Sequence, residues 1–492
     1  MKMQLSKVLE NLKYECNNFQ DFEIDDIVYD SRKAKGGTVF VALCGALSDG
    51  HDYIKSAYDN GARVFLTEKD VALSDDAVVI KTENTRAALA LISGNFFSHP
   101  DRELTVIGVT GTKGKTTVTH MLRTVLDNCG IKSGVIGTAG AYFGDKYLPT
   151  VNTTPESYET FKLMRLMLEN GCKAVCMEVS SLGLKHHRVD GIHFDTAVFT
   201  NLYPDHIGGH EHDSFEEYSY WKKQLFKKCD RAVLNADDVF SAEIEKEITC
   251  PYCTFSLYEK ADISASNIEK IRDGSFFGVG FECKNKDTSF HMKISMPGLF
   301  SVYNALAAYA VCTHMEIDNE SIVSAIKNAR VKGRNEFIDV PADFDVIIDY
   351  AHNGISMKSV IETVKEYEHS NVYTVFGSVG GRAQLRRKEM GLVSGAMADL
   401  SIITTDDPNF ESPAEIADEI ASYIKSQNGK YEIILDREKA VHYAMSKAKK
   451  GDFVLILGKG QETAQKVRGE KIPYSDHEAV FSYFNKPGKE EK

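Results

Sequence analysis

The sequence predicts an α/β protein with three domains, two of which are built on mostly parallel sheets. The chain has 492 residues, of which 43% are hydrophobic and 26% charged, and a chain of several hundred residues corresponds to domains of ~100–200 residues each. From Leu104 onward, apolar strand-like runs alternate with helix-like segments, and a second series of this kind begins after Arg334. Such alternation is typical of strand–helix units on a parallel sheet.

The order of these runs predicts the domain boundaries. Residues 1–100 contain short strand-like runs such as TVFVAL and RVFLTE, joined by turn-rich segments. Residues 101–332 contain the buried runs LTVIGV, KAVCMEV and TAVFTNL, with a polar, β-leaning stretch near residues 250–295. Residues 333–492 contain further runs from DVIIDYA to DFVLILG. We therefore expect a small N-terminal domain followed by two α/β domains.

The composition argues against several classes of protein. Lys and Arg total 58 against 71 Asp and Glu, a formal net charge of −13, so we expect no bulk affinity for nucleic acid or an anionic membrane. No apolar signal core and no run of about eighteen apolar residues is visible, so we expect neither secretion nor membrane insertion. The scattered cysteines predict reduced thiols in the cytoplasm. The spacings Cys250–Cys253 and Cys172–Cys176 lack a second ligand pair nearby, which argues against zinc.

The clearest chemical signal is a glycine-rich loop between a strand and a helix. The run at 104–109 leads into TGTKGKTT at 110–117, after which apolar residues recur at helical spacing. Glycines let backbone N–H groups approach a phosphate, a helix N-terminus favours negative charge, and Lys115 adds a cation. The loop has the short form GxxGKS/T and predicts a nucleotide site with Thr116 as a Mg²⁺ ligand; the alternative is a glycine turn without a ligand. The predicted site comprises Gly111, Thr112, Lys113, Gly114, Lys115, Thr116 and Thr117.

A second signal is a lysine on the apolar face of a helix. Ser214 and Glu217 form a capping box that begins a helix over residues 214–228. Lys222 recurs with Tyr218 at the spacing of one helical face, so it is predicted to face inward. The alternative is that its stem follows the apolar surface and its ammonium reaches solvent.

Two further polar residues follow strand-like runs. Glu178 and His206 each stand at the end of such a run, where the strands of a doubly wound sheet present ligand-binding residues. For His206, a capping or core histidine is the alternative.

Short segments over nearly the whole chain resemble the Mur ligase family. Its usual loop has Asn at the place of Lys113. The resemblance implies a small N-terminal UDP-binding α/β domain, a central ATP-binding domain of the P-loop ATPase type and a C-terminal Rossmann-like domain that binds an amino acid. The segments, in the family's order, are DSR at 30–32, TGTKGKTT at 110–117, NTTPE at 152–156, MEVSS at 177–181, HRV at 187–189, FTNLYPDH at 199–206, NALAA at 304–308, GRNEF at 333–337, DYAH at 349–352, DDPN at 406–409 and GKGQET at 458–463.

The resemblance is greatest to the members that add the third amino acid in peptidoglycan precursor synthesis. It implies that the γ-carboxylate of D-glutamate in UDP-MurNAc-L-Ala-D-Glu attacks the γ-phosphate of ATP, and that the amine of a diamino acid displaces phosphate from the acyl phosphate. Attack between two anions requires charge neutralisation. The implied cofactors are ATP and two Mg²⁺ ions, the implied partners are small molecules, and a cytoplasmic monomer is expected.

The resemblance also assigns roles to residues. Lys115, Glu178, His206 and Lys222 are the implied catalytic residues, with Lys222 carbamylated so that it becomes an anionic ligand. The implied metal ligands are Thr116, Glu178, His206 and carbamylated Lys222. Beyond the loop, the implied ATP contacts are Asn304, Arg334, Asp349 and His352. The implied contacts to the UDP-MurNAc-dipeptide are Ser31, Asn152, Thr153, Thr154, Ser180, His186 and Arg188, with Gly45, Asp49 and His51 in a neighbouring loop.

Four residues bear on which amino acid is added. Members that use meso-diaminopimelate read Asp-Asn-Pro-Arg, whose arginine binds the distal carboxylate. This chain reads Asp406-Asp407-Pro408-Asn409, and a neutral amide leaves that carboxylate unpaired at a cost of several kcal/mol. We therefore expect L-lysine, whose distal cation an acidic wall would receive, with meso-diaminopimelate and L-ornithine as alternatives. The implied amino-acid site comprises Arg387 at the α-carboxylate, Asp406, Asp407, Pro408, Asn409, Gly458 and Glu462.

Two other functions are the alternatives to this ligase. One is a relative that joins glutamate to folate, although such relatives lack the N-terminal uridine-binding domain that DSR at 30–32 indicates. The other is a nucleotide-binding regulator without chemistry, against which the intact Lys115, Glu178, His206 and inward Lys222 argue.

Overall fold

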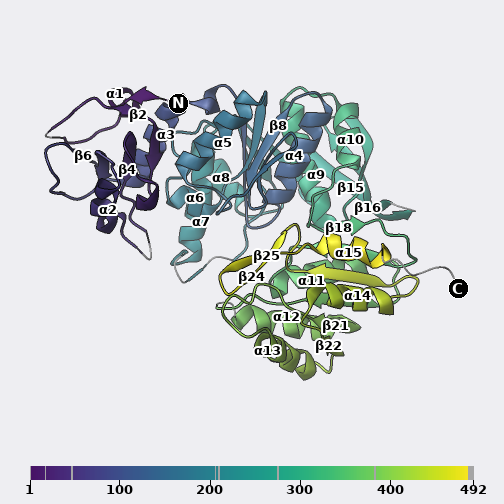
Figure 1. The fold of residues 1–492 in the computed structure, drawn as a ribbon. Helices are drawn as coiled ribbons and strands as arrows, with labels where there is room; N and C mark the ends of the chain where they lie inside the picture. The colour runs from purple at the N-terminus through teal and green to yellow at the C-terminus, as the bar shows by residue number, and fades with distance from the viewer. Residues whose placement is uncertain are drawn as a thin grey trace. The chain divides into compact units, whose positions relative to one another are not determined.

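The computed structural model describes residues 2–16, 18–45, 48–204, 207–208, 211–273, 276–286, 288–381 and 384–485. The chain divides into two compact units (Figure 1). The first unit comprises Met1–Ser264 and Tyr303–Ile322, and the second comprises Ala265–Val302 and Val323–Lys492.

The first unit begins with a small parallel sheet. Its four strands lie in the order β3-β4-β5-β6, and α3 follows directly after β6. The side chain of Asn84 caps α3 by accepting from the N–H groups of Arg86 and Ala87. The elements are β1 (Met3–Gln4), α1 (Leu5–Val8), β2 (Glu23–Ile24), β3 (Asp26–Val28), β4 (Thr38–Val41), α2 (Ile54–Asp59), β5 (Val64–Thr67), β6 (Val78–Lys81) and α3 (Thr85–Phe96).

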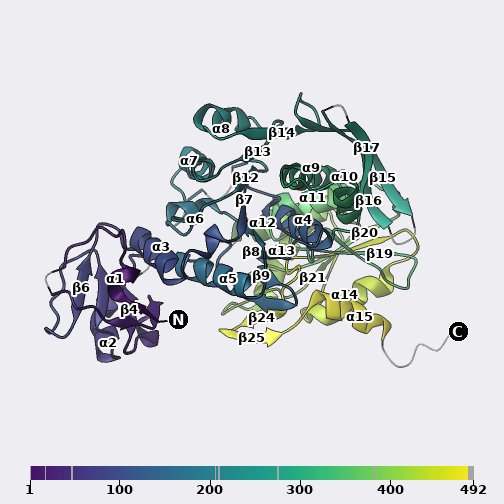
Figure 2. The same cartoon turned by 90° about the horizontal axis from the view of Figure 1, so that it is seen from above.

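A larger sheet follows in the same unit. Its first eight strands lie in the order β10-β9-β8-β11-β7-β12-β13-β14, and three later strands continue the sheet beyond β14. The strands from β8 to β14 in that order are parallel, while β9 and β10 are antiparallel, and Figure 2 shows β7, β12, β13 and β14 in succession. The elements are β7 (Thr105–Thr110), α4 (Lys115–Asn128), β8 (Ser133–Gly137), β9 (Gly140–Phe143), β10 (Lys146–Leu148), α5 (Ser157–Glu169), β11 (Ala174–Glu178), α6 (Ser181–Lys185), β12 (Thr196–Phe199), α7 (Phe215–Lys223), β13 (Ala232–Asn235), α8 (Ser241–Glu247), β14 (Tyr252–Ser256) and α9 (Leu299–His314).

The two sheets of the first unit share one hydrophobic core. Leu89 and Phe96 on α3 belong to the same buried cluster as Phe161 and Met164 on α5. Polar contacts join the same two parts, since the hydroxyl of Tyr158 donates to Asp26. The N-terminal hundred residues therefore pack on the larger sheet through both apolar and polar contacts.

The second unit contains a doubly wound sheet. Its order is β18-β19-β23-β20-β21-β22, with only β18 antiparallel. On β19, Ile347 belongs to one buried cluster and Val346 and Ile348 to the other, so both faces are covered by helices. The elements are β18 (Glu336–Ile338), β19 (Asp345–Asp349), α11 (Gly354–Lys365), β20 (Val372–Phe376), α12 (Gln384–Met397), β21 (Leu400–Ile403), α13 (Pro413–Ser426), β22 (Tyr431–Ile433), α14 (Arg437–Lys447), β23 (Phe453–Leu457), β24 (Ala464–Val467), β25 (Glu470–Pro473) and α15 (Asp476–Phe484).

The polar stretch near residues 250–295 forms strands, as predicted. After β14 come β15 (Ile263–Asp273), β16 (Phe276–Asn285) and β17 (Thr288–Ile294), and α10 (Asn319–Lys327) follows α9. Within the second unit, the ring of Phe277 lies 4.4 Å from that of Tyr367 and 5.6 Å from that of Phe453. Phe277 therefore packs with residues of the C-terminal sheet, while in sheet order the strands continue the large sheet as β14-β15-β16-β17; the assignment of this stretch to the middle domain stays a prediction.

The domain boundaries at residues 100 and 332 stay a prediction. No helix in the described part of the chain has both the length and the apolar character needed to cross a membrane.

Candidate active site

The glycine-rich loop connects β7 to the N-terminus of α4. Gly111 and Gly114 have φ angles of 148° and 90°, a region that side chains rarely adopt. A Cβ atom at Gly111 would lie 1.9 Å from Oγ1 of Thr200, and one at Gly114 would lie 2.6 Å from Oδ1 of Asn304. The loop therefore requires glycine at both positions, and Asn304, an expected ATP contact, lies against it.

Two lysines meet at this loop. Nζ of Lys115 donates to the carbonyl oxygen of Gly111 over 2.8 Å, and Nζ of Lys222 donates to the same oxygen over 2.9 Å. Lys222 is only 2% exposed, and its ammonium lies 4.7 Å from the ring centre of Tyr218. Lys222 thus faces inward, as the helical spacing predicted, and its ammonium does not reach solvent.

A buried carboxylate lies on the other side of the loop. Glu178, at the end of β11, is 1% exposed. Its Oε1 accepts from the hydroxyl of Thr116 over 2.9 Å and from the backbone N–H of Thr138 over 2.9 Å. A hydroxyl and a carboxylate at a phosphate loop are the hard oxygen ligands that Mg²⁺ prefers, so the donors present fit that ion. His206, the third implied ligand, lies outside the described residues.

The end of β12 holds the loop in place. Oγ1 of Thr200 donates to the carbonyl of Lys113 over 2.6 Å, and Oδ1 of Asn201 accepts from the N–H of Lys113 over 2.9 Å. Nδ2 of Asn235, at the end of β13, donates to the carbonyl of Thr200 over 2.8 Å. The carboxyl ends of three neighbouring strands therefore fix the shape of the loop.

The residues expected to contact the muramoyl peptide lie next to Glu178. Oγ1 of Thr154 donates to the carbonyl of Glu178 over 2.9 Å and accepts from the N–H of Ser180 over 2.9 Å. The hydroxyl of Thr153 lies 2.9 Å from that of Thr138. Ser180 also caps α6. These hydroxyls form a continuous polar strip from Thr138 and Glu178 to the start of α6. Asn152, which is also an expected contact of the muramoyl peptide, is half-buried beside Thr153.

The predicted diphosphate contact Arg188 is held by a carboxylate. Its guanidinium donates to Oε1 of Glu156 over 2.8 and 3.0 Å, and Nη1 of Arg86 lies 3.1 Å from Oε2 of the same carboxylate. Burial, together with the cations Arg86 and Arg188, lowers the pKa of His186 to about 4. His186 is therefore neutral at pH 7, and two arginines share one glutamate at the junction of the two sheets.

The expected uridine contacts lie on the small sheet. Ser31 is 8% exposed and its carbonyl accepts from Nδ2 of Asn60 over 2.9 Å. In the neighbouring loop, Nδ1 of His51 lies 2.6 Å from Asp49, and Nε2 accepts from the N–H of Glu68 over 3.0 Å. Both ring nitrogens are engaged, so His51 positions the loop rather than offering a metal ligand.

In the second unit, the acidic residues expected to receive the distal cation of the amino acid already have a counter-ion within the protein. Lys459 is fully buried, and its Nζ lies 2.8 Å from Asp407, 2.8 Å from Glu462 and 3.4 Å from Asp406. Burial alone would lower the pKa of Lys459, but the three carboxylates outweigh burial and raise the pKa. A Cβ atom at Gly458 would lie 2.7 Å from Oδ2 of Asp406. The structure thus brings four expected amino-acid contacts together around a lysine that the sequence analysis did not identify.

The other expected amino-acid contacts also have protein partners. The guanidinium of Arg387 contacts Glu411 and donates to Glu419 over 2.8 Å. The amide of Asn409 donates to the carbonyl of Gly380 over 3.1 Å, and the carbonyl oxygen of Pro408 packs so closely on Gly380 that a Cβ there would lie 1.9 Å away. This loop is therefore braced by backbone contacts.

The expected ATP contacts of the second unit cluster at the end of β19. The carboxylate of Asp349 accepts from the N–H groups of Asn335 and Ala351 over 2.6 and 2.7 Å. The guanidinium carbon of Arg334 lies 4.6 Å above the ring of Tyr350, and Nδ1 of His352 lies 2.8 Å from the carbonyl oxygen of Tyr350.

Three family models match this chain, in an order that follows the architecture just described. They are the Mur ligase family catalytic domain over residues 23–97, the Mur ligase middle domain over residues 109–312, and the glutamate ligase domain of the Mur ligases over residues 333–460. The chain belongs to the Mur ligase family.

Relatives of this Mur ligase match along its whole length. The chain is 40% identical over 479 residues to a UDP-N-acetylmuramoyl-L-alanyl-D-glutamate–2,6-diaminopimelate ligase of Caldanaerobacter subterraneus, covering 97% of this chain and 98% of the relative. It is 37% identical over 489 residues to a ligase of the same name from Clostridium acetobutylicum, covering 98% and 99%. A solved structure of a ligase of this name has a TM-score of 0.70 at 24% identity over 99% of both chains, which shows a shared fold.

Family membership confirms the three-domain Mur ligase architecture and the activity class, an ATP-dependent acid–amino-acid ligase. The sequence analysis missed Thr200, Asn201, Glu156 and Lys459 as functional residues, although each stands inside a quoted segment. Thr200 and Asn201 follow a buried strand directly, which is the signal that would have identified them. Two of the three carboxylate partners of Lys459 lie 52 and 53 residues away in sequence, so only the contact with Glu462 is local and the shared role of this lysine could not be read from its segment.

Proposed function

We propose that this Mur ligase joins a diamino acid to the γ-carboxylate of D-glutamate in UDP-MurNAc-L-Ala-D-Glu, in the cytoplasm, through an acyl phosphate formed from ATP. The proposal rests on one cluster at the glycine-rich loop between β7 and α4. The cluster comprises Lys115, Thr116, Glu178 and Lys222. The names of the curated relatives support the same nucleotide-sugar substrate.

In this proposal, Thr116, Glu178 and His206 are Mg²⁺ ligands, and Lys222, once carbamylated, is a ligand of a second Mg²⁺ ion. Bound Mg²⁺ supplies neutralisation of the phosphate charge during attack by a carboxylate. Lys115 and the N-terminus of α4 provide fixed positive charge at the same place. The hydroxyl strip from Thr153 to Ser180 positions the peptide whose carboxylate attacks.

For the added amino acid, we propose L-lysine. Asn409 offers no cation to a distal carboxylate, and it braces the loop through Gly380. Nearby, the carboxylates of Asp406, Asp407 and Glu462 outnumber the two ammonium groups that face them, those of buried Lys459 and of exposed Lys466, which lies 3.8 Å from Asp407. The excess negative charge favours a substrate whose distal group is a cation over one whose distal group carries a carboxylate. L-ornithine, one methylene shorter, is the closest competitor by charge.

meso-Diaminopimelate is the second candidate, because the curated relatives are named for it. Arg468 is the residue whose side chain could bind the distal carboxylate of meso-diaminopimelate. Its backbone N–H donates to the carbonyl of Asn409 over 2.6 Å, and its side chain is exposed. In this alternative the guanidinium of Arg468 binds the distal carboxylate in place of an arginine at position 409.

The test is phosphate release from ATP with L-lysine, meso-diaminopimelate and L-ornithine, each alone and then in equimolar competition. Release should require the UDP-MurNAc-dipeptide and should be fastest with L-lysine. Preferential incorporation of meso-diaminopimelate that Arg468→Ala abolishes would establish the second candidate instead. Absence of release with every diamino acid would contradict the ligase itself.

A further inference from the structure

Two cysteines face each other at the edge of the large sheet opposite the phosphate loop. Cys229 precedes β13 and Cys250 precedes β14, and their Sγ atoms lie 3.8 Å apart. The two strands are parallel neighbours in which Ala232 pairs with Tyr252, and the N–H of Ala232 donates to the carbonyl of Pro251 over 3.0 Å. The backbone therefore fixes the two thiols beside each other independently of their side-chain contact.

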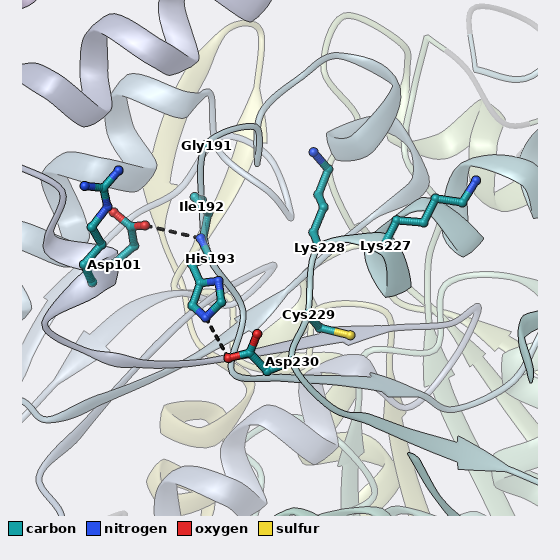
Figure 3. Close-up of a pocket in the computed structure, with 9 residues that line it drawn as sticks. Asp101, Gly191, Ile192, His193, Lys227, Lys228, Cys229 and Asp230 are labelled. Carbon is teal, nitrogen blue, oxygen red and sulfur yellow. Dashed lines mark hydrogen bonds and ion pairs between the residues drawn. The ribbon is translucent and has the colours of Figure 1, made fainter. Parts of the chain in front are cut away.

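Cys229 also borders an open cavity of about 640 Å³. Figure 3 shows its sulfur on the segment that carries Lys228 and Asp230, across from His193. The ring of His193 is tied to Asp230 over 2.9 Å. A small, uncharged oxidant can thus approach Cys229 from this cavity, while both cysteines are half-buried.

We propose that Cys229 and Cys250 form a reversible dithiol–disulfide pair that hydroperoxides oxidise. A disulfide requires the sulfurs to approach from 3.8 Å to about 2.05 Å, and the pairing of the strands that follow the two cysteines keeps their backbone segments neighbours during this approach. The bond would close the segment 229–250, which contains β13 and α8.

The chemistry is balanced by the peroxide. One thiolate attacks an oxygen atom of the hydroperoxide and breaks the O–O bond, which gives a sulfenic acid and releases, after protonation, water from hydrogen peroxide or an alcohol from an alkyl hydroperoxide. The second thiolate then attacks the sulfenic sulfur, and the sulfenyl oxygen leaves as water after protonation. The two sulfurs lose two electrons, and the peroxide is reduced by the same two. A thiol reductant reverses the bond by exchange.

The surroundings also predict the pH dependence of this reaction. Burial, with the neighbouring Cys250, raises the pKa of the Cys229 thiol to about 12. Since the thiolate is the reactive form, oxidation should be slow at pH 7 and should accelerate by up to about tenfold per pH unit towards pH 9.

The test uses the full-length chain treated with hydrogen peroxide, followed by thiol blocking, trypsin and mass spectrometry. Trypsin cleavage predicts that the peptide 229–231 will be linked to the peptide 247–260. The link should be absent without peroxide and should disappear after treatment with dithiothreitol. Because the second peptide contains Cys253 as well, Cys253→Ser is the matched control and should keep the link, whereas Cys250→Ser should lose it.

Two outcomes would overturn the proposal. One is a link that survives in Cys250→Ser and is lost in Cys253→Ser. The other is oxidation of Cys229 to a sulfinic acid without any link while Cys44, the exposed thiol of the small sheet, is fully oxidised. Cys229→Ser, with unchanged circular dichroism, serves as the second variant that must lose the link. None of these readouts depends on ligase activity.

Discussion

Lys115 and Lys222 donate to one and the same acceptor, the backbone carbonyl of Gly111, over 2.8 and 2.9 Å. Carbamylation of Lys222 would replace one of these two ammonium groups by an anion and leave Lys115 as the fixed cation at this carbonyl. One of the two lies on the loop itself and the other on α7, so the two positions can be tested separately.

The first prediction concerns Lys222. If a carbamate on Lys222 supplies a metal ligand, Lys222→Ala should lose most phosphate release while folding normally, and bicarbonate or formate should restore part of it. Lys223→Ala is the matched control, since Nζ of Lys223 contacts Glu243 and Glu247 instead of the loop, and it should keep near-normal activity. A fully active Lys222→Ala enzyme would refute the role.

The second prediction concerns Glu178. Replacing Glu178 by Gln removes the buried charge beside Thr116, so the Mg²⁺ concentration needed for half-maximal phosphate release should rise at least about tenfold. Glu159→Gln changes a half-buried carboxyl elsewhere in the first unit, which accepts a hydrogen bond from Tyr29, and should leave the Mg²⁺ requirement unchanged. Equal Mg²⁺ titrations for the two variants would exclude Glu178 as a ligand.

The third prediction concerns Lys459 as a positioning residue. Lys459→Met leaves Asp406, Asp407 and Glu462 without their shared counter-ion, so the KM for the amino acid should rise about tenfold or more, while the KM for ATP stays within about twofold. Lys459→Arg should recover part of the loss.

The control for Lys459 is another buried ion pair of the same unit. Arg437 and Asp476 are fully buried and joined over 2.8 Å, and Arg437→Met should destabilise folding by about 3–5 kcal/mol without raising the KM for the amino acid. If both variants change that KM equally, Lys459 acts only through stability.

The fourth prediction concerns pH. The folded-state pKa of His186 is about 4, below the ordinary value of 6.5, so below pH 6.5 the unfolded chain binds the proton more readily. Stability contributed by neutral His186 should therefore be complete above pH 6.5 and decrease as the pH falls towards 4. Denaturant unfolding of His186→Gln should show a flatter pH dependence than the parent in this window. Identical slopes would contradict the shift.

Local patterns predicted some parts of the site and long-range pairing determined the others. The run 104–109, the glycine loop and the inward Lys222 could be identified from sequence because each depends on spacing within one or two elements. The clamp by Thr200 and Asn201 arises only because β12 lies beside β7. The same limit applies to Arg387, whose partners Glu411 and Glu419 come from the segment before α13 and from α13 itself. The packing of Phe277 on the C-terminal sheet likewise required tertiary structure.

The two sheets of the first unit share a single hydrophobic core, which limits how the N-terminal part of this enzyme can be exchanged with that of another ligase. Because Leu89 and Phe96 are buried with Phe161 and Met164, cutting the chain near residue 100 would expose apolar surface on both pieces. Arg86 would also lose Glu156, which stays with Arg188 in the other fragment. The N-terminal part of the first unit is therefore not an interchangeable cassette. Chimaeras that exchange it between ligases must carry α5 together with α3, or redesign both surfaces.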